Sequence, residues 1–180
     1  ELHRGEFAAF ADGPRAVCAD EIPGVSLSRH LDDGTLSVPM VRAAGREMRR
    51  AHEWRCHEFG AAWSHGDPHT GNFIYASAGD RARLIDFEVR HHRSLAETAR
   101  HADDLLVFLQ DVVGRVSGGQ WLPFAHAFLE GYGRSDIIGY LQERLVVPSG
   151  IARIWWAVRT TYLERRELAR RINQLRAALA

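Results

Sequence analysis

Eight consecutive residues, 65–72, read His-Gly-Asp-Pro-His-Thr-Gly-Asn and constrain the fold of this chain more than any other segment. Residues 84–88, Leu-Ile-Asp-Phe-Glu, follow at short range. We call these two segments the octet and the pentad. The β-favouring runs 73–75 and 84–85 flank a Ser-Ala-Gly-Asp turn sequence, which predicts a β-hairpin. One short hairpin would bring polar side chains of the octet and the pentad together.

The side chains that this hairpin brings together suit phosphoryl transfer, in which a protein mainly positions groups and neutralises charge. Asp67 suits the carboxylate that orients an attacking hydroxyl and accepts its proton. Asn72 and Asp86 suit the ligands of Mg²⁺, which prefers hard oxygen donors. Gly66 and Gly71 are expected to give the octet unusual dihedral angles on either side of the acid. The spacing therefore predicts a metal–phosphate site with Asp67 as its catalytic residue.

At these residues the chain resembles the protein-kinase-like superfamily. The resemblance is to its small-molecule branch, typified by aminoglycoside phosphotransferases, choline kinases and lipopolysaccharide-core sugar kinases. That branch carries His-Gly-Asp-x-His-x-x-Asn, and the octet matches all five fixed positions. Residues 86–88 of the pentad are similar to the metal-binding Asp-Phe-Gly element, with glutamate in third place. The resemblance implies an α+β, protein-kinase-like fold, with a mainly helical C-lobe, a short N-terminal β-hairpin and a β-hairpin that carries the metal site.

The resemblance also implies a division of the chain and a set of ligands. Residues 1–24 correspond to a remnant of the N-lobe and the hinge, and residues 25–180 to the C-lobe. The backbone around Ala19, Glu21 and Ile22 would hold the adenine of ATP. ATP and Mg²⁺ are the implied cofactors, and the implied reaction is transfer of the γ-phosphate to a hydroxyl of a small molecule or sugar. An aspartate in the helix after the pentad, Asp103 or Asp104, would anchor the structure.

The chain contains no lysine, because all 23 of its basic Lys/Arg side chains are arginine. Kinases of this superfamily hold the ATP phosphates with a lysine on an N-lobe strand, beneath a glycine-rich loop. We therefore expect a chain that lacks most of the N-lobe. An alternative function is a non-catalytic kinase-like module that binds a nucleotide or a partner.

Three further polar residues near the site have supporting roles or none. We expect His65 to hold the octet by hydrogen bonds to backbone, and His69 to position Asp67 or a neighbouring helix. Glu88 either adds a second carboxylate to the metal or faces water.

A metal hydrolase is a less favoured alternative. His65, Asp67, His69 and residues 91–92, His-His, are plausible zinc or manganese ligands. That alternative leaves Asn72 and the pentad without a role.

Composition excludes several other classes of protein. Positive and negative side chains balance at 23 each, so no strong net charge attracts nucleic acid. The two cysteines form no paired motif, which favours a reducing compartment. No apolar run approaches the ~18 residues that span a bilayer. These features predict a cytoplasmic protein without a membrane span or a nucleic-acid partner.

Periodicity and turn residues predict the remaining elements. A hairpin is expected at residues 5–11 and 15–20, and Ser26 is expected to cap a short helix that ends near Leu31. The longer helices are expected at residues 39–59, 96–113, 121–132 and 151–179. Gly114 and Gly133 are predicted to stop two of them. The arginines of the last helix are expected on a solvated face, at positions 165, 166, 170 and 171.

Overall fold

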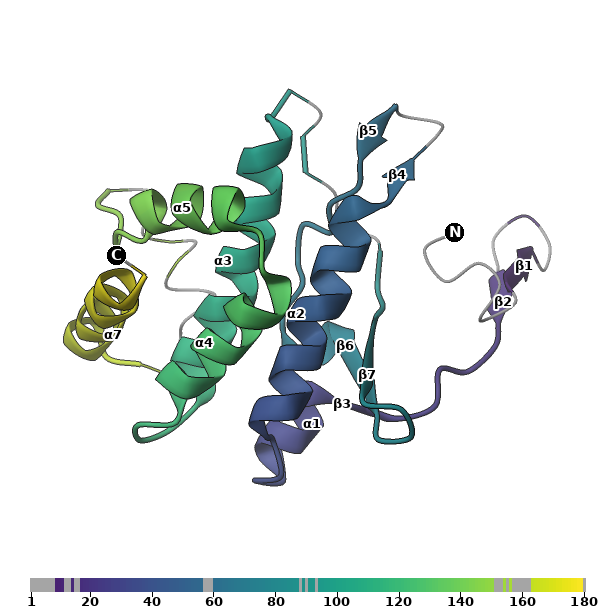
Figure 1. Cartoon of the computed structure of the whole chain (residues 1–180), viewed down its shortest axis with the longest axis horizontal. Coiled ribbons are helices and arrows are strands. Elements are labelled where there is room, and N and C mark those ends of the chain that lie inside the picture. The colour runs from purple at the N-terminus through teal and green to yellow at the C-terminus, as the bar shows by residue number, and fades with distance from the viewer. Residues whose placement is uncertain are drawn as a thin grey trace.

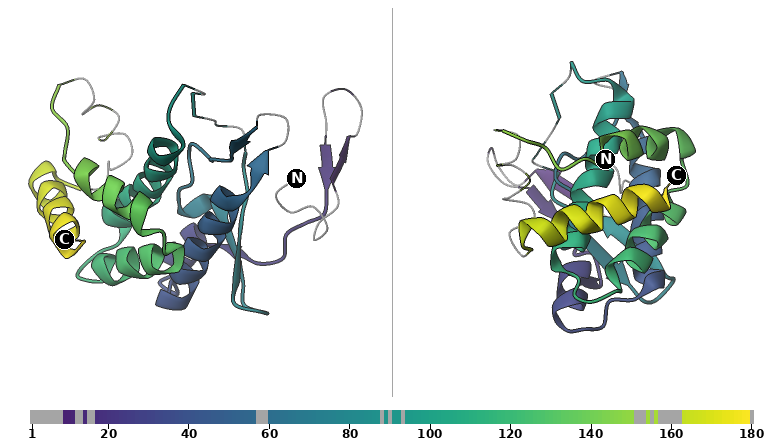
Figure 2. Two further views of the ribbon diagram at one scale, coloured as in Figure 1. Left: turned by 45° about the horizontal axis from the view of Figure 1, so that its top comes forward. Right: turned by 90° about the vertical axis from the view of Figure 1, so that its left-hand side faces the viewer.

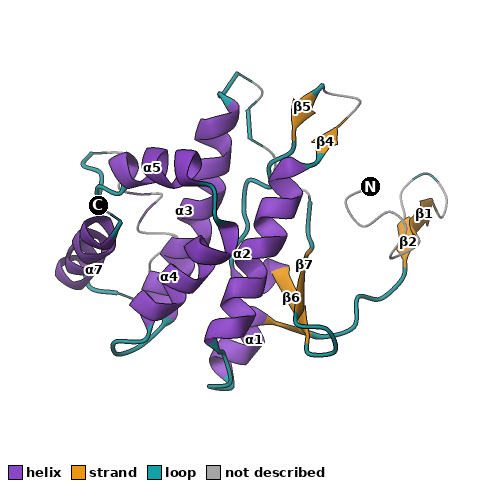
Figure 3. Cartoon of the chain, in the orientation of Figure 1, coloured by secondary structure: helices purple, strands orange, loops and turns teal. Residues whose placement is uncertain are grey.

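A computed structural model of the chain describes residues 9–11, 14, 17–56, 60–87, 89, 91–92, 94–150, 154, 156 and 163–179. This part of the chain is α+β, as expected, with helices forming most of the body and strands gathered on one side (Figures 1 and 3). None of its helices is long and apolar enough to cross a bilayer.

Two antiparallel hairpins appear where the sequence predicts them. Strands β1 (Ala9–Ala11) and β2 (Val17–Ala19) pair with each other near the N-terminus. Strands β6 (Phe73–Ala76) and β7 (Arg81–Leu84) form the hairpin between the octet and the pentad. A short strand that the sequence did not reveal, β3 (Val25–Ser26), pairs with β6 to give a sheet in the order β3-β6-β7. Because β6 follows the octet and β7 leads into the pentad, this sheet brings the two segments together at one edge.

The helical body surrounds a single cluster of buried apolar side chains. Helix α1 (Leu27–Asp32) begins at Ser26, whose side chain accepts a hydrogen bond from the Arg29 amide as predicted. The other helices are α2 (Val38–Glu53), α3 (Glu97–Arg115), α4 (Trp121–Tyr132), α5 (Ser135–Arg144) and α7 (Arg165–Ala178). A second small hairpin, β4 (Arg55–Cys56) with β5 (Ala61–Ala62), follows α2. Helix α4 has the predicted bounds and ends at Gly133, which adopts a left-handed conformation.

Several predicted bounds were wrong. Helix α2 ends at Glu53 rather than residue 59, because Trp54 turns extended and the apolar stripe of the helix meets an arginine, Arg55, at its next position. Helix α3 continues through Gly114 to Arg115. The predicted single helix over 151–179 is interrupted, since Glu164 is extended and caps α7. Much of its first half, including Ile151, Trp155, Val158 and Tyr162, lies outside the described residues. Helix α5 was not predicted.

Arg171 is not on a solvated face, in contrast to its expected position. It is 5% exposed, whereas its neighbours Arg166 and Arg170 are exposed. Its Nη1 donates to the carbonyl oxygens of Val113 at 2.8 Å and Val116 at 2.7 Å. These carbonyls close the C-terminal end of α3, where a cation is favourable. Arg171 thereby fastens α7 to α3, and α7 lies at the outer edge of the helical body in the left view of Figure 2.

Helices α2 and α4 approach each other closely at two glycines. A Cβ atom added to Gly45 would lie 2.1 Å from the Phe128 carbonyl oxygen, and one added to Gly131 would lie 2.2 Å from the Arg42 carbonyl oxygen. Both contacts are with backbone, which cannot rotate away as a side chain can. The residues flanking the contact, Ala44 and Phe128, are fully buried. The two helices can therefore pack at this distance only with glycine at both positions.

Replacing Gly45 with alanine should destabilise the protein by about 1–3 kcal/mol, because the helices must separate to admit the methyl group. Gly139→Ala is the matched control, since Gly139 lies within α5 with no atom within 4 Å of an added Cβ. That substitution should instead stabilise by about 0.5–1 kcal/mol through helix propensity. Urea unfolding measures both. Equal effects of the two substitutions would contradict the close helix contact.

Candidate active site

The N-terminal part of the octet is held by one buried carboxylate from α3. Asp104 accepts hydrogen bonds from the backbone amides of His65 at 2.8 Å and Gly66 at 2.7 Å. It has no solvent exposure. Of the two aspartates proposed as an anchor, Asp104 therefore fills the role, while Asp103 points elsewhere and pairs with His91. Gly66 has a φ of 94°, which confirms the unusual dihedral angle expected before Asp67.

A buried polar chain fixes the charge of Asp104. Burial alone raises the pKa of this carboxyl, but the hydrogen bond from His52 and the other donors around it lower its pKa overall. Burial also raises the pKa of Tyr132, so this phenol keeps its proton and donates to His52 Nδ1 at 2.9 Å. His52 Nε2 in turn carries the proton that binds Asp104, at 3.0 Å. The carboxylate thus stays ionised and continues to accept the hydrogen bonds of the octet amides.

A second carboxylate of α3 holds the C-terminal part of the octet. Asp111 accepts from both the amide and the hydroxyl of Thr70. Thr70 begins a 3-10 turn, η1 (Thr70–Asn72), which His69 caps by accepting from the Gly71 amide at 3.0 Å. Gly71 does not have a positive φ, so its expected role was wrong. It is required for space instead, because an added Cβ would lie 2.7 Å from the His69 ring.

His65 ties the octet to the pentad, as expected for a residue with a supporting role. Its Nε2 donates to the Ile85 carbonyl at 2.8 Å, and its Nδ1 accepts from the Asp67 amide at 3.2 Å. The Ile85 amide donates to the Asn72 carbonyl at 2.9 Å, extending the β6–β7 pairing by one step. Residue 85 is therefore bonded on both sides to the octet, and Asp86 follows it immediately.

Three side chains at this edge have oxygens that bond to no described residue. Asn72 donates from Nδ2 to the Asp67 carbonyl at 2.9 Å, which leaves its Oδ1 free to accept. The carboxylates of Asp67, half-buried, and Asp86, exposed, have no hydrogen bond or ion pair with a described residue. Asp86 also has a φ of 62°, a left-handed conformation that is rare outside glycine and concentrated at functional sites.

The residues predicted to hold adenine are not brought to the octet by any described bond. Ala19 ends β2, and Glu21 and Ile22 lie in the extended segment that leads to β3, with Glu21 exposed. That segment is anchored close by at Gly24, where an added Cβ would lie 2.3 Å from the Tyr75 carbonyl oxygen. Tyr75 is three residues beyond Asn72 on β6. Glu88 lies outside the described residues.

The histidines proposed as transition-metal ligands are engaged in other bonds. Both ring nitrogens of His65 are used within the site, and those of His91 contact Ser64 Oγ and Asp103, each at 3.1 Å. His92 contacts Ser94. Within the described residues there is no group of three or more His, Cys, Asp or Glu side chains arranged to hold a metal ion.

Asp111 is the site residue that the sequence-based interpretation missed. It lies seven residues after Asp104, two helical turns along the same face of α3. An acidic residue on the buried face of a helix indicates that its carboxylate has a bonding partner in the interior. The predicted apolar stripe of that helix could have drawn attention to it.

His101 packs against His52 and stays neutral. Its ring stacks on that of His52 with centroids 3.9 Å apart, and its Nε2 donates to the Trp63 carbonyl at 2.9 Å. Burial, and then the neighbouring His52, lower the pKa of His101 to about 3. Its Nδ1 is buried and has no hydrogen-bond partner among the described residues.

The stability of the protein should therefore fall on acidification between pH 6.5 and pH 4.5. In this window the unfolded chain binds a proton at His101 that the folded chain does not, which costs about 1.4 kcal/mol per pH unit. His101→Gln should flatten this slope by one proton, whereas His126→Gln, at an exposed position on α4, should not. Urea unfolding across the window measures the slope. Equal slopes in both variants would contradict the neutral state of His101.

Asp104→Asn should destabilise the protein by about 3 kcal/mol, because an amide cannot accept all the hydrogen bonds that converge on the buried carboxylate. Asp103→Asn is the control from the adjacent position. Its side chain is 41% exposed, and its loss should cost less than about 1 kcal/mol. Thermal or urea unfolding distinguishes the two. A small effect at position 104 would show that the octet is held by other contacts.

No protein-family model, curated protein or solved structure matches the chain. The function of the chain is therefore inferred from the geometry of the octet and the pentad. In that geometry, two aspartates of α3 bind backbone amides of the octet, and three side chains at its edge carry oxygens that lack described partners.

Proposed function

We propose that the chain is the C-lobe of an ATP-dependent phosphotransferase of the protein-kinase-like fold, which transfers the γ-phosphate to a hydroxyl of a small molecule or sugar. The observation that carries this proposal is the contrast between two sets of oxygens. The carboxylates of Asp104 and Asp111 are consumed in holding the octet. The side-chain oxygens of Asp67, Asn72 and Asp86 have no described partner and suit a hard cation and a reacting hydroxyl.

In the proposed reaction, Asp67 orients the acceptor and takes its proton. The acceptor oxygen attacks the γ-phosphorus, the bond from that phosphorus to the β,γ-bridging oxygen breaks, and ADP leaves with the bridging oxygen. Asn72 Oδ1 and the Asp86 carboxylate would hold Mg²⁺, which neutralises charge on the phosphates when bound. Two protein ligands are a normal complement for this ion, since phosphate oxygens and water supply the rest.

The rigidity of the octet supports this division of roles. Phosphoryl transfer relies on positioning, and a displacement of about 1 Å can cost a hundredfold in rate. The Asp67 backbone is fixed from both sides, by its own amide to His65 and by its carbonyl to Asn72. Asp86 is placed by the two backbone bonds of Ile85. The reacting groups thus stand on a prearranged backbone.

The absence of lysine favours a second candidate, a non-catalytic kinase-like module that binds a nucleotide or a partner. A lysine that holds the ATP phosphates from the other side would have to come from sequence outside these 180 residues. The two candidates differ in what Mg²⁺ and ATP do together. A phosphotransferase binds them jointly and turns over, whereas a partner-binding module need not bind them.

Asp67→Asn should lower ATP turnover of the full-length protein by about 10²–10⁴-fold, because it removes the proton acceptor without removing a structural bond. Its affinity for Mg²⁺–ATP should stay within twofold of the unmodified protein. Asn72→Ala and Asp86→Asn should weaken that affinity instead. Calorimetric titration and ADP release measure the two quantities.

Asp33→Asn is the matched control for these carboxylate substitutions. Asp33 is exposed at the end of α1 and its side chain bonds, among the described residues, only to Arg29, so both binding and turnover should be unchanged. Retained turnover in Asp67→Asn would remove Asp67 from the mechanism. Absence of Mg²⁺-dependent ATP binding, in this chain and in one extended upstream, would favour the partner-binding module.

A further inference from the structure

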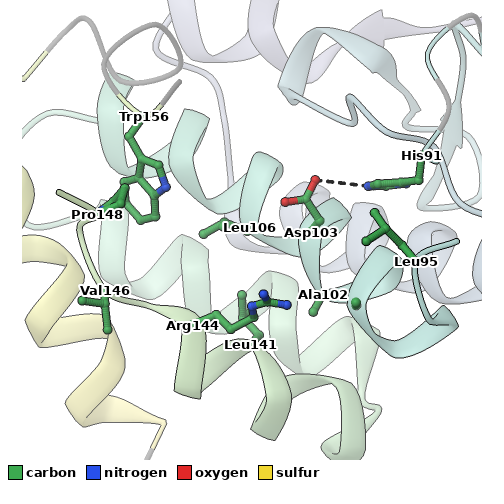
Figure 4. A pocket seen from close by; sticks show the side chains of 11 residues that line it. His91, Leu95, Ala102, Asp103, Leu106, Leu141, Arg144, Val146, Pro148 and Trp156 are labelled. Carbon is green, nitrogen blue, oxygen red and sulfur yellow. Dashed lines mark hydrogen bonds and ion pairs between the residues drawn. The ribbon is translucent and has the colours of Figure 1, made fainter. Parts of the chain in front are cut away.

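A cavity of about 520 Å³ opens between α3, α5 and the segment after α5 (Figure 4). This volume is typical of sites that enclose small molecules. The described lining is mainly apolar and includes Leu95, Leu106, Leu141, Val146, Pro148 and Trp156. Leu95 and Val146 are 47% and 52% exposed, so apolar surface faces the opening. A ligand with an apolar body would gain from covering it.

The cavity is linked to the octet through His91. His91 lines it and contacts both Ser64 Oγ and the Asp103 carboxylate, each at 3.1 Å. Ser64 directly precedes the octet, and Asp103 directly precedes the residue that anchors it. A molecule in the cavity therefore contacts His91, which is bonded to the residue before the octet, and Asp103, which is the neighbour of its anchor.

The charges of the lining are asymmetric. Asp103 is the carboxylate of the described lining, and its Oδ2 is bonded to His91 Nε2 at 3.1 Å. Arg144 reaches in from α5 and donates to the hydroxyl of Tyr140 at 2.6 Å, with its guanidinium over the same ring. No described carboxylate forms an ion pair with Arg144. The cavity thus offers a cation that lacks an anion.

We infer that this cavity binds the phosphate acceptor, and that the acceptor has an apolar, ring-sized body and an anionic group that pairs with Arg144. The role of the ligand as phosphate acceptor rests on the proposed function. The binding of an apolar, anionic molecule does not. This lining disfavours cationic acceptors such as aminoglycosides or choline, because Arg144 has no described carboxylate to offset its charge and would repel them. Planar anions such as carboxylate or sulfonate suit a guanidinium, which can donate two parallel hydrogen bonds.

Two fluorescent dyes test the binding chemistry directly. Anilinonaphthalene sulfonate and N-phenylnaphthylamine share an apolar ring system, but only the first carries an anion. The protein should bind one anilinonaphthalene sulfonate per chain, at least tenfold more tightly than the neutral dye. Arg144→Gln should abolish this preference and leave affinity for the neutral dye within twofold. Kanamycin, a polycation, should not displace either dye.

Arg166→Gln is the matched control, because Arg166 is an exposed arginine on α7 that does not line the cavity. It should bind both dyes as the unmodified protein does. Equal affinity for the two dyes, an unchanged preference in Arg144→Gln, or displacement by kanamycin would each overturn the inference.

Hydrolysis of ATP by the full-length protein separates this inference from the proposed function. Anilinonaphthalene sulfonate has no hydroxyl, so in the acceptor cavity it should exclude water and slow ADP release at least fivefold without weakening ATP binding. Arg144→Gln should relieve this inhibition. Dye binding through Arg144 without inhibition would overturn the acceptor role alone. Dye binding in a protein that does not bind Mg²⁺–ATP would overturn the phosphotransferase and leave the small-molecule site standing.

Discussion

The carboxylate of Asp104 is the interaction on which the rest of the site depends. A buried charge is expensive unless hydrogen bonds surround it, and Asp104 receives two backbone amides of the octet and the His52 ring. These partners come from two separate parts of the chain, α2 and the loop before β6, while Asp104 itself lies on α3. Removing any one of them leaves a buried charge undercompensated. The cost of burying Asp104 therefore couples the position of the octet to the packing of two helices.

A single helix holds both ends of the octet. Asp104 and Asp111 are two turns apart on α3, about 10.5 Å along the axis at the usual helical rise. One binds the amides at the start of the octet and the other binds Thr70 near its end. Arg115, one turn further, contacts Asp32 at the end of α1 and continues the same series. The helix thus acts as a rigid frame, and the loop cannot shift along it without breaking bonds at both ends.

Local chemistry determined what could be predicted from the sequence. The hairpin of β6 and β7, the Ser26 cap and helix α4 follow from turn residues, capping and a glycine that takes a left-handed conformation. The octet was identifiable because it is a short segment with many polar residues at characteristic spacings. What failed depends on contacts distant in sequence: Arg171 is buried by the carbonyls of another helix, and Asp111 by a threonine 41 residues earlier. Periodicity assigns a residue to a face but does not show which partner lies opposite.

The site contains four aspartates, which have the same side chain but different roles because their surroundings differ. Asp104 and Asp111 are surrounded by donors, so their oxygens have little capacity left for a ligand. Asp67 and Asp86 are placed by bonds to their own backbone or that of a neighbour, which leaves both carboxylates free of described partners. A carboxylate positioned through its backbone can meet a cation or a proton without first breaking a bond. The left-handed φ of Asp86 fits this arrangement. Neighbouring residues hold its strained backbone, and its side chain stays available.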